Sequence, residues 1–428
     1  MDRTKRIFIY LLMKANSFSL VLIASLIIGT LQTAKAQEIQ SSDSVVTGIS
    51  GPASVAGQMA RDAKDEVNIL PSYFAFKKRL KAKSHFNYTV DYWSVFQGAT
   101  AGLAGNESTG YSGIVRAFGT WDLAGRKSGN TGTFIFKFEN RHRYNDHPTP
   151  QDLGFNVGYA GLTAVPFSGI GWAVTNFFWQ QSLLKGKLAF QVGLLDPADY
   201  TNVYGLVDPW NDFYNLAFST GVTIPLPNQG IGLSIRGSIT DNLYVLGGIS
   251  DANGDPTDPF GMFDSFFGTG EYFTQLEVGW AKSYAERFSD NIHLFAWHAD
   301  ARQMAMTPEG WGMAFSFNKM YANHWLPFVR AGYAKDGGTL WQKSFETGLG
   351  YHFPSNGQQV SIGFSWGQPS ESTLGEGLRD QYTMELYYRL HLIKIITLTP
   401  DIQLLINPAL NPDKNFIAVF GLRGRVSL

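Results

Sequence analysis

Ionic and aromatic residues alternate along residues 133–143, which read TFIFKFENRHR. The even positions carry Phe134, Phe136 and Phe138, and the odd positions carry Lys137, Glu139 and Arg141. Because a β-strand directs successive side chains to opposite faces, this segment has one aromatic face and one ionic face. A soluble sandwich would bury the phenylalanines and hydrate the ions. A membrane barrel would place the phenylalanines against lipid and the ions in a water-filled lumen.

No common catalytic motif occurs in the chain. The sequence lacks H-E-x-x-H, G-x-S-x-G and the P-loop, and its eight histidines do not have the spacing of an ordinary metal site. Outer-membrane phospholipases are barrels with a serine–histidine pair, but nothing near Ser182 in WQQSLL marks it as a nucleophile. The sequence therefore predicts a protein that is not an enzyme and that has no cofactor.

A short acidic stretch, DANGD, places Asp251, Asn253 and Asp255 as the first ligands of a calcium loop would be placed. The glutamate that completes such a loop is absent from the position after Gly261, where Met262 stands. We interpret the stretch as a polar turn and predict no metal site.

The N-terminus has the pattern of a secretory signal peptide. Basic residues precede the apolar run FSLVLIASLIIGTL at residues 18–31, and AKA supplies the small residues of a cleavage site after Ala36. We expect residues 1–36 to be removed during export through the general secretory route. The alternative is an uncleaved membrane anchor, for which the apolar run is short.

Composition limits the class of the exported chain. Charged residues make up 16% and aromatic residues 14% of the sequence, whereas soluble domains carry about 25% charged residues. Removal of residues 1–36 takes five of the 34 Lys+Arg and one of the 35 Asp+Glu, which leaves a net charge of −5. A mildly acidic chain lacks the excess of positive charge that is typical of nucleic-acid-binding proteins, so we predict no nucleic-acid partner. With no cysteine, the chain has no disulfides.

The remaining chain divides at His85. Residues 37–84 begin with polar and small residues and end in the basic stretch FAFKKRLKAKS, so we predict a periplasmic or loop-like lead segment with one short helix. Residues 85–428 alternate apolar and polar residues almost throughout. Because they contain no run of about 18 apolar residues, they can span a membrane only as a closed β-barrel.

About eighteen candidate strands can be counted in residues 85–428, many near the ~9–11 residues that a tilted membrane strand needs. Phe, Tyr, Trp, Leu, Ile and Val repeat on one face of each, and polar or small residues occupy the other. Turn-rich breaks such as SDANGDPTDP and NPALNPD separate them. The predicted fold is all-β, an antiparallel transmembrane β-barrel with short periplasmic turns and longer extracellular loops.

The last fifty residues resemble the carbohydrate-selective porins of the OprB family. The family pattern is a Glu-x-Tyr-Tyr-Arg strand, a Thr-Pro-Asp-x-Gln strand and an Asn-Pro turn before a closing strand that bears arginine. The matching residues are Glu385, Tyr387, Tyr388, Arg389, Thr399, Pro400, Asp401, Gln403, Asn407 and Pro408. The stretches GLLDPADYTNVYG and GGISDANGDP resemble two upstream loops of the same family.

This resemblance implies sixteen strands rather than eighteen. The two segments most easily removed from the count are residues 155–165 and 216–224, which would then be loops or inward-folded segments. One departure concerns the C-terminus, where such barrels usually end in an aromatic residue that the barrel-assembly machinery reads. This chain ends in Leu428, which is apolar and falls on an outward-facing position of the alternating pattern in the last strand.

The resemblance also implies a porin, whose selectivity requires charged or aromatic side chains fixed on the wall of a constriction. Sugar hydroxyls can pair with arginine and carboxylate groups, and sugar C–H faces can pack on aromatic rings. The candidates are the charged or aromatic residues that fall on inward-facing positions of the alternating strand pattern. They are Trp93, Arg116, Lys137, Glu139, Arg141, Arg236, Glu277, Arg330, Glu346, Glu385 and Arg389. Each could instead hydrate the pore or pair with its neighbour across the strands.

The predicted function is passive diffusion of small neutral sugars across the Gram-negative outer membrane, because the inward charges have mixed signs. Expected partners are the permeating carbohydrates, outer-membrane lipid and the barrel-assembly machinery, with the chain either a monomer or a homotrimer. A general or otherwise selective porin is the alternative within transport. An outer-membrane enzyme and a structural or adhesive surface barrel are the alternatives from other classes.

Overall fold

The computed structural model describes residues 48–62, 69–354 and 357–428. The predicted signal peptide therefore lies outside the described residues. The described residues from Gly48 to Phe353 and from Gly357 to Leu428 belong to one compact unit. None of the helices in the described ranges is long and apolar enough to cross a membrane.

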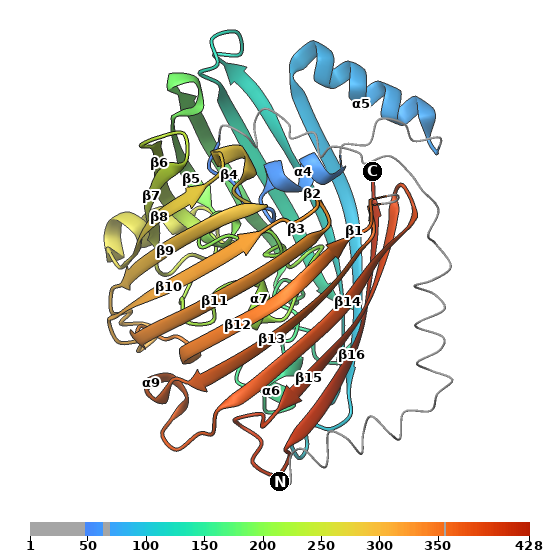
Figure 1. Cartoon of the computed structure of the whole chain (residues 1–428), viewed down its shortest axis with the longest axis vertical. Helices are drawn as coiled ribbons and strands as arrows, with labels where there is room; N and C mark the ends of the chain where they lie inside the picture. The colour runs from blue at the N-terminus through green and yellow to red at the C-terminus, as the bar shows by residue number, and fades with distance from the viewer. Residues whose placement is uncertain (1–47, 63–68, 355–356) are drawn as a thin grey trace. The chain divides into compact units, whose positions relative to one another are not determined.

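Sixteen strands close into one barrel, in which each strand pairs antiparallel with its neighbours in the chain and β1 pairs with β16 (Figure 1). The strands are β1 (Phe86–Ala99), β2 (Thr109–Ala124), β3 (Gly132–Arg143), β4 (Gly171–Leu183), β5 (Leu188–Leu195), β6 (Gly230–Ser238), β7 (Leu243–Asp251), β8 (Tyr272–Ala281), β9 (Asp290–Ala299), β10 (Gly310–Lys319), β11 (Trp325–Asp336), β12 (Trp341–His352), β13 (Gln359–Pro369), β14 (Gln381–Ile393), β15 (Ile396–Ile406) and β16 (Phe416–Ser427). The prediction of a closed antiparallel barrel is confirmed, with sixteen strands.

The count of eighteen was wrong for a local reason. Residues 155–165 and 216–224 form no strands but lie in two long loops that fold inward, with α6 (Leu153–Asn156) in one and α7 (Leu216–Ser219) in the other. Both segments are apolar because they pack inside the barrel, where Val157, Tyr159 and Phe218 are fully buried. Apolar content alone cannot distinguish such a segment from a strand.

Alternation along each strand separates an outer from an inner face. On β3, Phe138 is 39% exposed, whereas Lys137 and Glu139 are buried. The same holds on the last strand, where Phe420 and Leu422 are exposed and Arg423 is buried. The barrel therefore presents its apolar side chains outward and its ions inward, as lipid and lumen require.

The C-terminal residue takes part in closure. The Leu428 N–H donates to the Val90 carbonyl over 2.8 Å, and the Val90 N–H donates to the Leu428 carbonyl over 3.2 Å. Leu428 thus extends the β1–β16 pairing despite not being aromatic.

Connections differ between the two ends of the barrel. The end that carries Leu428 has short turns, such as 184–187 and 394–395, and the opposite end has long loops. Two of the long loops fold into the barrel, namely the β3–β4 loop (144–170) and the β5–β6 loop (196–229). Smaller helices α8 (Gly261–Asp264) and α9 (Glu371–Leu374) lie in other loops of that end.

Within the described residues 48–62 and 69–85, two helices precede the barrel, where the sequence predicted one short helix. The helix α5 (Pro71–Ser84) contains the basic stretch, and none of its residues is buried. The helix α4 (Val55–Asp62) ends a segment, residues 48–62, that we call the inner segment. Its side chains Ile49, Val55 and Met59 are buried against inward-facing residues of the barrel wall, so it is not the loop-like lead that the sequence suggested.

Candidate functional site

All eleven predicted site residues lie on inward faces of the strands. Each is 9% exposed or less, and the set comprises Trp93, Arg116, Lys137, Glu139, Arg141, Arg236, Glu277, Arg330, Glu346, Glu385 and Arg389. Their neighbours divide them into five residues of a cluster on β1–β3, four that hold the β5–β6 loop, Glu346 beside one of these four, and one outlying arginine.

The cluster on β1–β3 is organised by Asp91. This carboxylate accepts hydrogen bonds from Arg116 Nε over 2.9 Å and from Arg425 Nε over 2.9 Å. Trp93 Nε1 donates to the same carboxylate over 3.1 Å. Asp91 stands opposite Arg116 in the β1–β2 register, and Trp93 stands opposite Arg425 across the β1–β16 seam. One buried carboxylate thereby fixes two guanidinium groups and one indole at the closure of the barrel.

A second tryptophan comes from the β5–β6 loop. Arg116 Cζ lies 4.0 Å from the centroid of the Trp210 ring, and Arg141 Cζ lies 5.9 Å from it. The Trp93 and Trp210 rings are 6.0 Å apart. Guanidinium groups at these distances from aromatic faces make cation–π contacts worth about 0.5–2 kcal/mol each. Trp210 was not predicted because it lies in a loop, where strand parity gives no signal.

The ions of β3 form the other half of the cluster. Arg141 Nε donates to Glu139 Oε2 over 2.7 Å, and Lys137 Nζ lies 3.8 Å from Asp199 Oδ2 and 4.0 Å from Glu139 Oε1. Arg116 stands opposite Glu139 in the β2–β3 register. Trp93, Arg116, Lys137, Glu139 and Arg141 thus form one continuous polar surface across three neighbouring strands.

Burial raises the pKa of Asp199, in the β5–β6 loop, to about 8; the nearby Lys137 ammonium lowers that pKa, and the charge of Asp196 raises it further. Asp199 also accepts a hydrogen bond from Asn176 Nδ2 over 3.1 Å. The pKa of this carboxyl is thus raised although it lies beside the Lys137 ammonium, because the effect of burial is larger than that of the ammonium.

Four predicted residues bind the β5–β6 loop rather than one another. Glu385 accepts from the Tyr214 and Asn215 N–H groups over 2.9 and 3.2 Å. Glu277 Oε2 accepts from the Asn202 N–H over 3.1 Å. Arg330 Nη1 donates to the Thr220 carbonyl over 2.7 Å, and Arg389 Nη1 donates to Asp212 Oδ1 over 3.0 Å. Their geometry is that of anchors, because each pairs with a buried polar group of the loop.

Glu346 stands opposite Arg330 in the β11–β12 register. Both line a small cavity with Asn202, Thr223 and Ser344. Within the described chain, Glu346 Oε1 and Arg330 Nε have no hydrogen-bond partner. Buried polar atoms of this kind are usually satisfied by water or by a solute hydroxyl.

Arg236 lies apart from these groups. Its guanidinium carbon is 3.9 Å from the Tyr284 ring, and Nη1 donates to Ser238 Oγ over 2.9 Å. Both partners belong to the end of the barrel with the short turns, so the structure does not bring Arg236 to Trp93 and Trp210.

Sequence parity missed several residues of the site. Asp91 and Arg425 have inward parity but were not selected, and Asp208, Trp210 and Asp212 lie in the loop sequence DPWND. That acidic and aromatic loop motif is the one signal that could have indicated them. No group of three or more His, Asp or Glu that could hold a metal ion occurs within residues 48–62, 69–354 and 357–428.

The cluster of Trp93, Trp210, Arg116, Glu139 and Arg141, which we call the tryptophan cluster, combines the two features that a polyhydroxylated neutral solute requires. Its guanidinium and carboxylate groups can exchange hydrogen bonds with hydroxyls, and its indole rings can pack on C–H faces. Arg116 Nη1 and Glu139 Oε1 are buried and make no hydrogen bond within the described chain, so either atom could bond a solute hydroxyl only where the solute enters the cluster itself.

Comparison with known proteins gives a family and a fold. The family model described as "Carbohydrate-selective porin, OprB family" matches residues 150–428. The high-pH structure of Pseudomonas putida OprB is 16% identical, with a TM-score of 0.65, and the match covers 83% of this chain and 97% of that one. The low-pH structure of the same protein is 14% identical, with a TM-score of 0.50, and the match covers 84% and 98%. No curated protein sequence matches the chain.

Proposed function

Because the chain belongs to the carbohydrate-selective porin, OprB family, we propose that the tryptophan cluster inside its barrel selects the sugars that pass. The chain is a sugar porin, an outer-membrane β-barrel through which carbohydrates diffuse. Porins of this family and fold are channels rather than enzymes. Selection by diffusion requires contacts that form and break quickly, so the cluster must bind sugars weakly.

The observation that carries this proposal is the placement of Arg116 between Asp91 and Trp210. One edge of the guanidinium is fixed by the carboxylate, with Nε to Oδ1 at 2.9 Å, and its carbon lies 4.0 Å from the indole centroid. A fixed guanidinium loses little side-chain entropy when it binds a hydroxyl, so it can discriminate between solutes by geometry. The mixed charges of Arg116, Glu139 and Arg141 favour neutral solutes over ions of either sign.

Export through the general secretory route and insertion by the barrel-assembly machinery belong to the same proposal. The apolar run at residues 18–31 supports export, and the pairing of Leu428 with Val90 supports a complete final strand. The outward faces of the strands would contact outer-membrane lipid, and the functional unit would be a monomer or a homotrimer.

Single-channel recording with sugars tests the role of the cluster. We expect Arg141→Ala, Glu139→Ala and Trp210→Ala to weaken sugar block of the current by about five-fold or more, since one lost charged or aromatic contact is worth about 1 kcal/mol. Arg143→Ala and Trp172→Ala are matched controls, because Arg143 has a half-exposed side chain and Trp172 is 72% exposed.

Unchanged sugar block in all three cluster variants would exclude the cluster from selection. Liposome swelling distinguishes the wider alternatives. Sugars that enter faster than amino acids of matched size support a carbohydrate-selective pore, equal rates indicate a general porin, and absence of permeation would contradict transport altogether.

A further inference from the structure

The inward side chains of this barrel are covered by protein. Sixteen-stranded porins enclose enough space for an aqueous channel, and residues of the channel wall then remain in contact with water. Here Arg116, Glu139 and Glu385 are 0% exposed. The β3–β4 and β5–β6 loops from one end and the inner segment from the other end account for this coverage, because all three make contacts with the inner wall.

One side of the inner segment packs on an apolar patch of the wall. Ile49, Val55 and Met59 form a buried cluster with inward-facing Phe118 and Ile135, and this cluster also includes Phe178, Ala189, Leu195, Tyr200 and Leu246. An aqueous lumen would favour polar residues at these inward positions. The apolar side chains of this part of the wall therefore contact the apolar side chains of the inner segment and do not line an aqueous lumen.

Polar contacts anchor the start of the inner segment. The Ile49 N–H donates to Gln180 Oε1 over 3.1 Å, and Arg287 Nη2 donates to the Ser50 carbonyl over 2.6 Å. Gly51 lies so close to the β5–β6 loop that a Cβ there would stand 2.3 Å from the Asp199 carbonyl oxygen.

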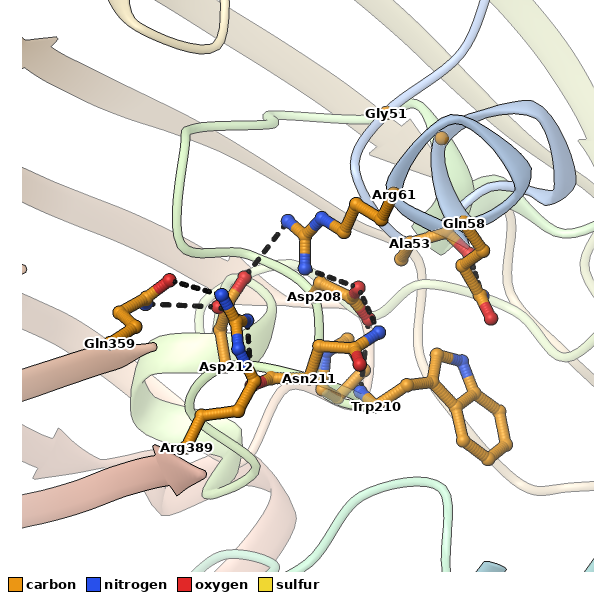
Figure 2. Close-up of polar contacts among 12 residues, drawn as sticks. Gly51, Ala53, Gln58, Arg61, Asp208, Trp210, Asn211, Asp212, Gln359 and Arg389 are labelled. Carbon is orange, nitrogen blue, oxygen red and sulfur yellow. Dashed lines mark hydrogen bonds and ion pairs between the residues drawn. The ribbon is translucent and has the colours of Figure 1, made fainter. Parts of the chain in front are cut away.

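Ion pairs anchor its end. Arg61 Nη1 lies 2.9 Å from Asp208 Oδ2, and Arg61 Nη2 lies 3.1 Å from Asp212 Oδ2, as Figure 2 shows. Asp62 accepts from Arg425 Nη1 over 2.7 Å and from Nη2 over 2.6 Å. The Arg61 side chain is 31% exposed, whereas the side chains of Asp208 and Asp212 are 0% and 1% exposed.

These anchors share their partners with the proposed selection site. Arg425 binds both Asp62 and Asp91, so α4 connects to the carboxylate that orients Arg116 and Trp93. Asp212 binds both Arg61 and Arg389 (Figure 2). Ala53 packs in the same buried cluster as Trp93 and Trp210.

We propose that the inner segment is a specificity-determining constriction element, which narrows the sugar path from inside the barrel and is held in place by Arg61 and Asp62. This inference rests on the proposed function, because it assigns to residues 48–62 the narrowing of a path for sugars. The partly exposed Arg61 faces solute at the constriction, and the apolar wall under α4 keeps the segment docked. Together with the β5–β6 loop, it defines which sugars fit.

Recordings on the full chain test the element. Deletion of residues 48–62, and separately the pair Arg61→Ala with Asp62→Asn, should raise single-channel conductance by about two-fold or more and weaken discrimination between small and large sugars, since the narrowest section controls both. Arg79→Ala is the matched control, because Arg79 is an exposed arginine on α5. If the wild type passes sugars and both variants retain its conductance and sugar discrimination, the inference is wrong while the proposed function stands. A wild type that passes no sugar would contradict the proposed function itself.

Thiol labelling gives a second measurement that does not depend on a deletion variant that folds. The natural chain has no cysteine, so Met59→Cys and Arg79→Cys each introduce a unique thiol. Met59 is 8% exposed, so we expect a membrane-impermeant thiol reagent to modify Met59→Cys at least about ten-fold more slowly than Arg79→Cys. Addition of Arg61→Ala and Asp62→Asn should bring the two rates together. Equal rates in the otherwise native chain would show that the segment is not docked and would overturn the proposal.

Discussion

At the scale of single residues, the alternating pattern placed the predicted side chains on the inner face of the barrel but gave no role to any of them. Of the eleven predicted residues, Arg116 and Arg141 lie against the Trp210 ring, and Glu139 accepts a hydrogen bond from Arg141. Glu277, Arg330, Glu385 and Arg389 instead bind groups of the β5–β6 loop. Parity gives only the face of the sheet. The role depends on which loop group reaches that side chain.

The carboxyl of Asp199 provides a pH test at this scale. Its pKa in the folded chain is about 8 and in an unfolded chain about 3.9, so the folded state binds more protons between these values. The stabilisation is therefore complete below pH ~4 and is lost as the pH rises through ~8. Between pH 5 and pH 9, the free energy of unfolding in urea should fall more for the wild type than for Asp199→Asn. Equal losses in both proteins would contradict the raised pKa.

At the scale of elements, the strands and the inward-folded segments have different determinants. Strand positions follow from period-two alternation, and all sixteen occur in the region where the sequence predicted them. The inner segment has no such signal, because α4 is short and its apolar residues face a wall built from five strands. Its docking depends on partners such as Gln180 and Arg425, which are distant in the sequence.

Gly51→Ala tests this docking. The added methyl group would stand 2.3 Å from the Asp199 carbonyl oxygen and 2.9 Å from Val203 Cγ1, so the inner segment must shift. We expect a loss of about 1–3 kcal/mol in the free energy of unfolding, with a rise in single-channel conductance. Gly237→Ala serves as the control, because a Cβ there has nothing within 4 Å. Identical unfolding curves for the two variants would argue against close packing at Gly51.

At the scale of the whole molecule, the barrel reverses the soluble pattern, since apolar residues face outward along its strands. Leu294, in the middle of β9, is 58% exposed, while its neighbour Phe295 is buried inside. In water an outer surface of this kind would drive association, whereas lipid satisfies it. Closure through β1 and β16 leaves no strand edge in the lipid.

Leu294→Arg tests this orientation in lipid vesicles. A charge at the middle of the lipid-facing surface should lower the free energy of unfolding by about 2–4 kcal/mol. Met304→Arg places the same charge in the loop at 300–309, where Met304 is 91% exposed, and should have little effect. A tolerated arginine at position 294 would mean that this face does not contact hydrocarbon.

The sequence by itself determined the barrel, its outward and inward faces, and the family. These features repeat locally, because a strand reverses its face at every residue whatever its partner. Only the tertiary structure decided the partners of the inward side chains, the approach of the loop sequence DPWND to α4 and β14, and the position of residues 48–62 inside the barrel. Those features depend on contacts such as Arg61 with Asp208 and Arg425 with Asp62, which join distant parts of the chain and leave no local pattern.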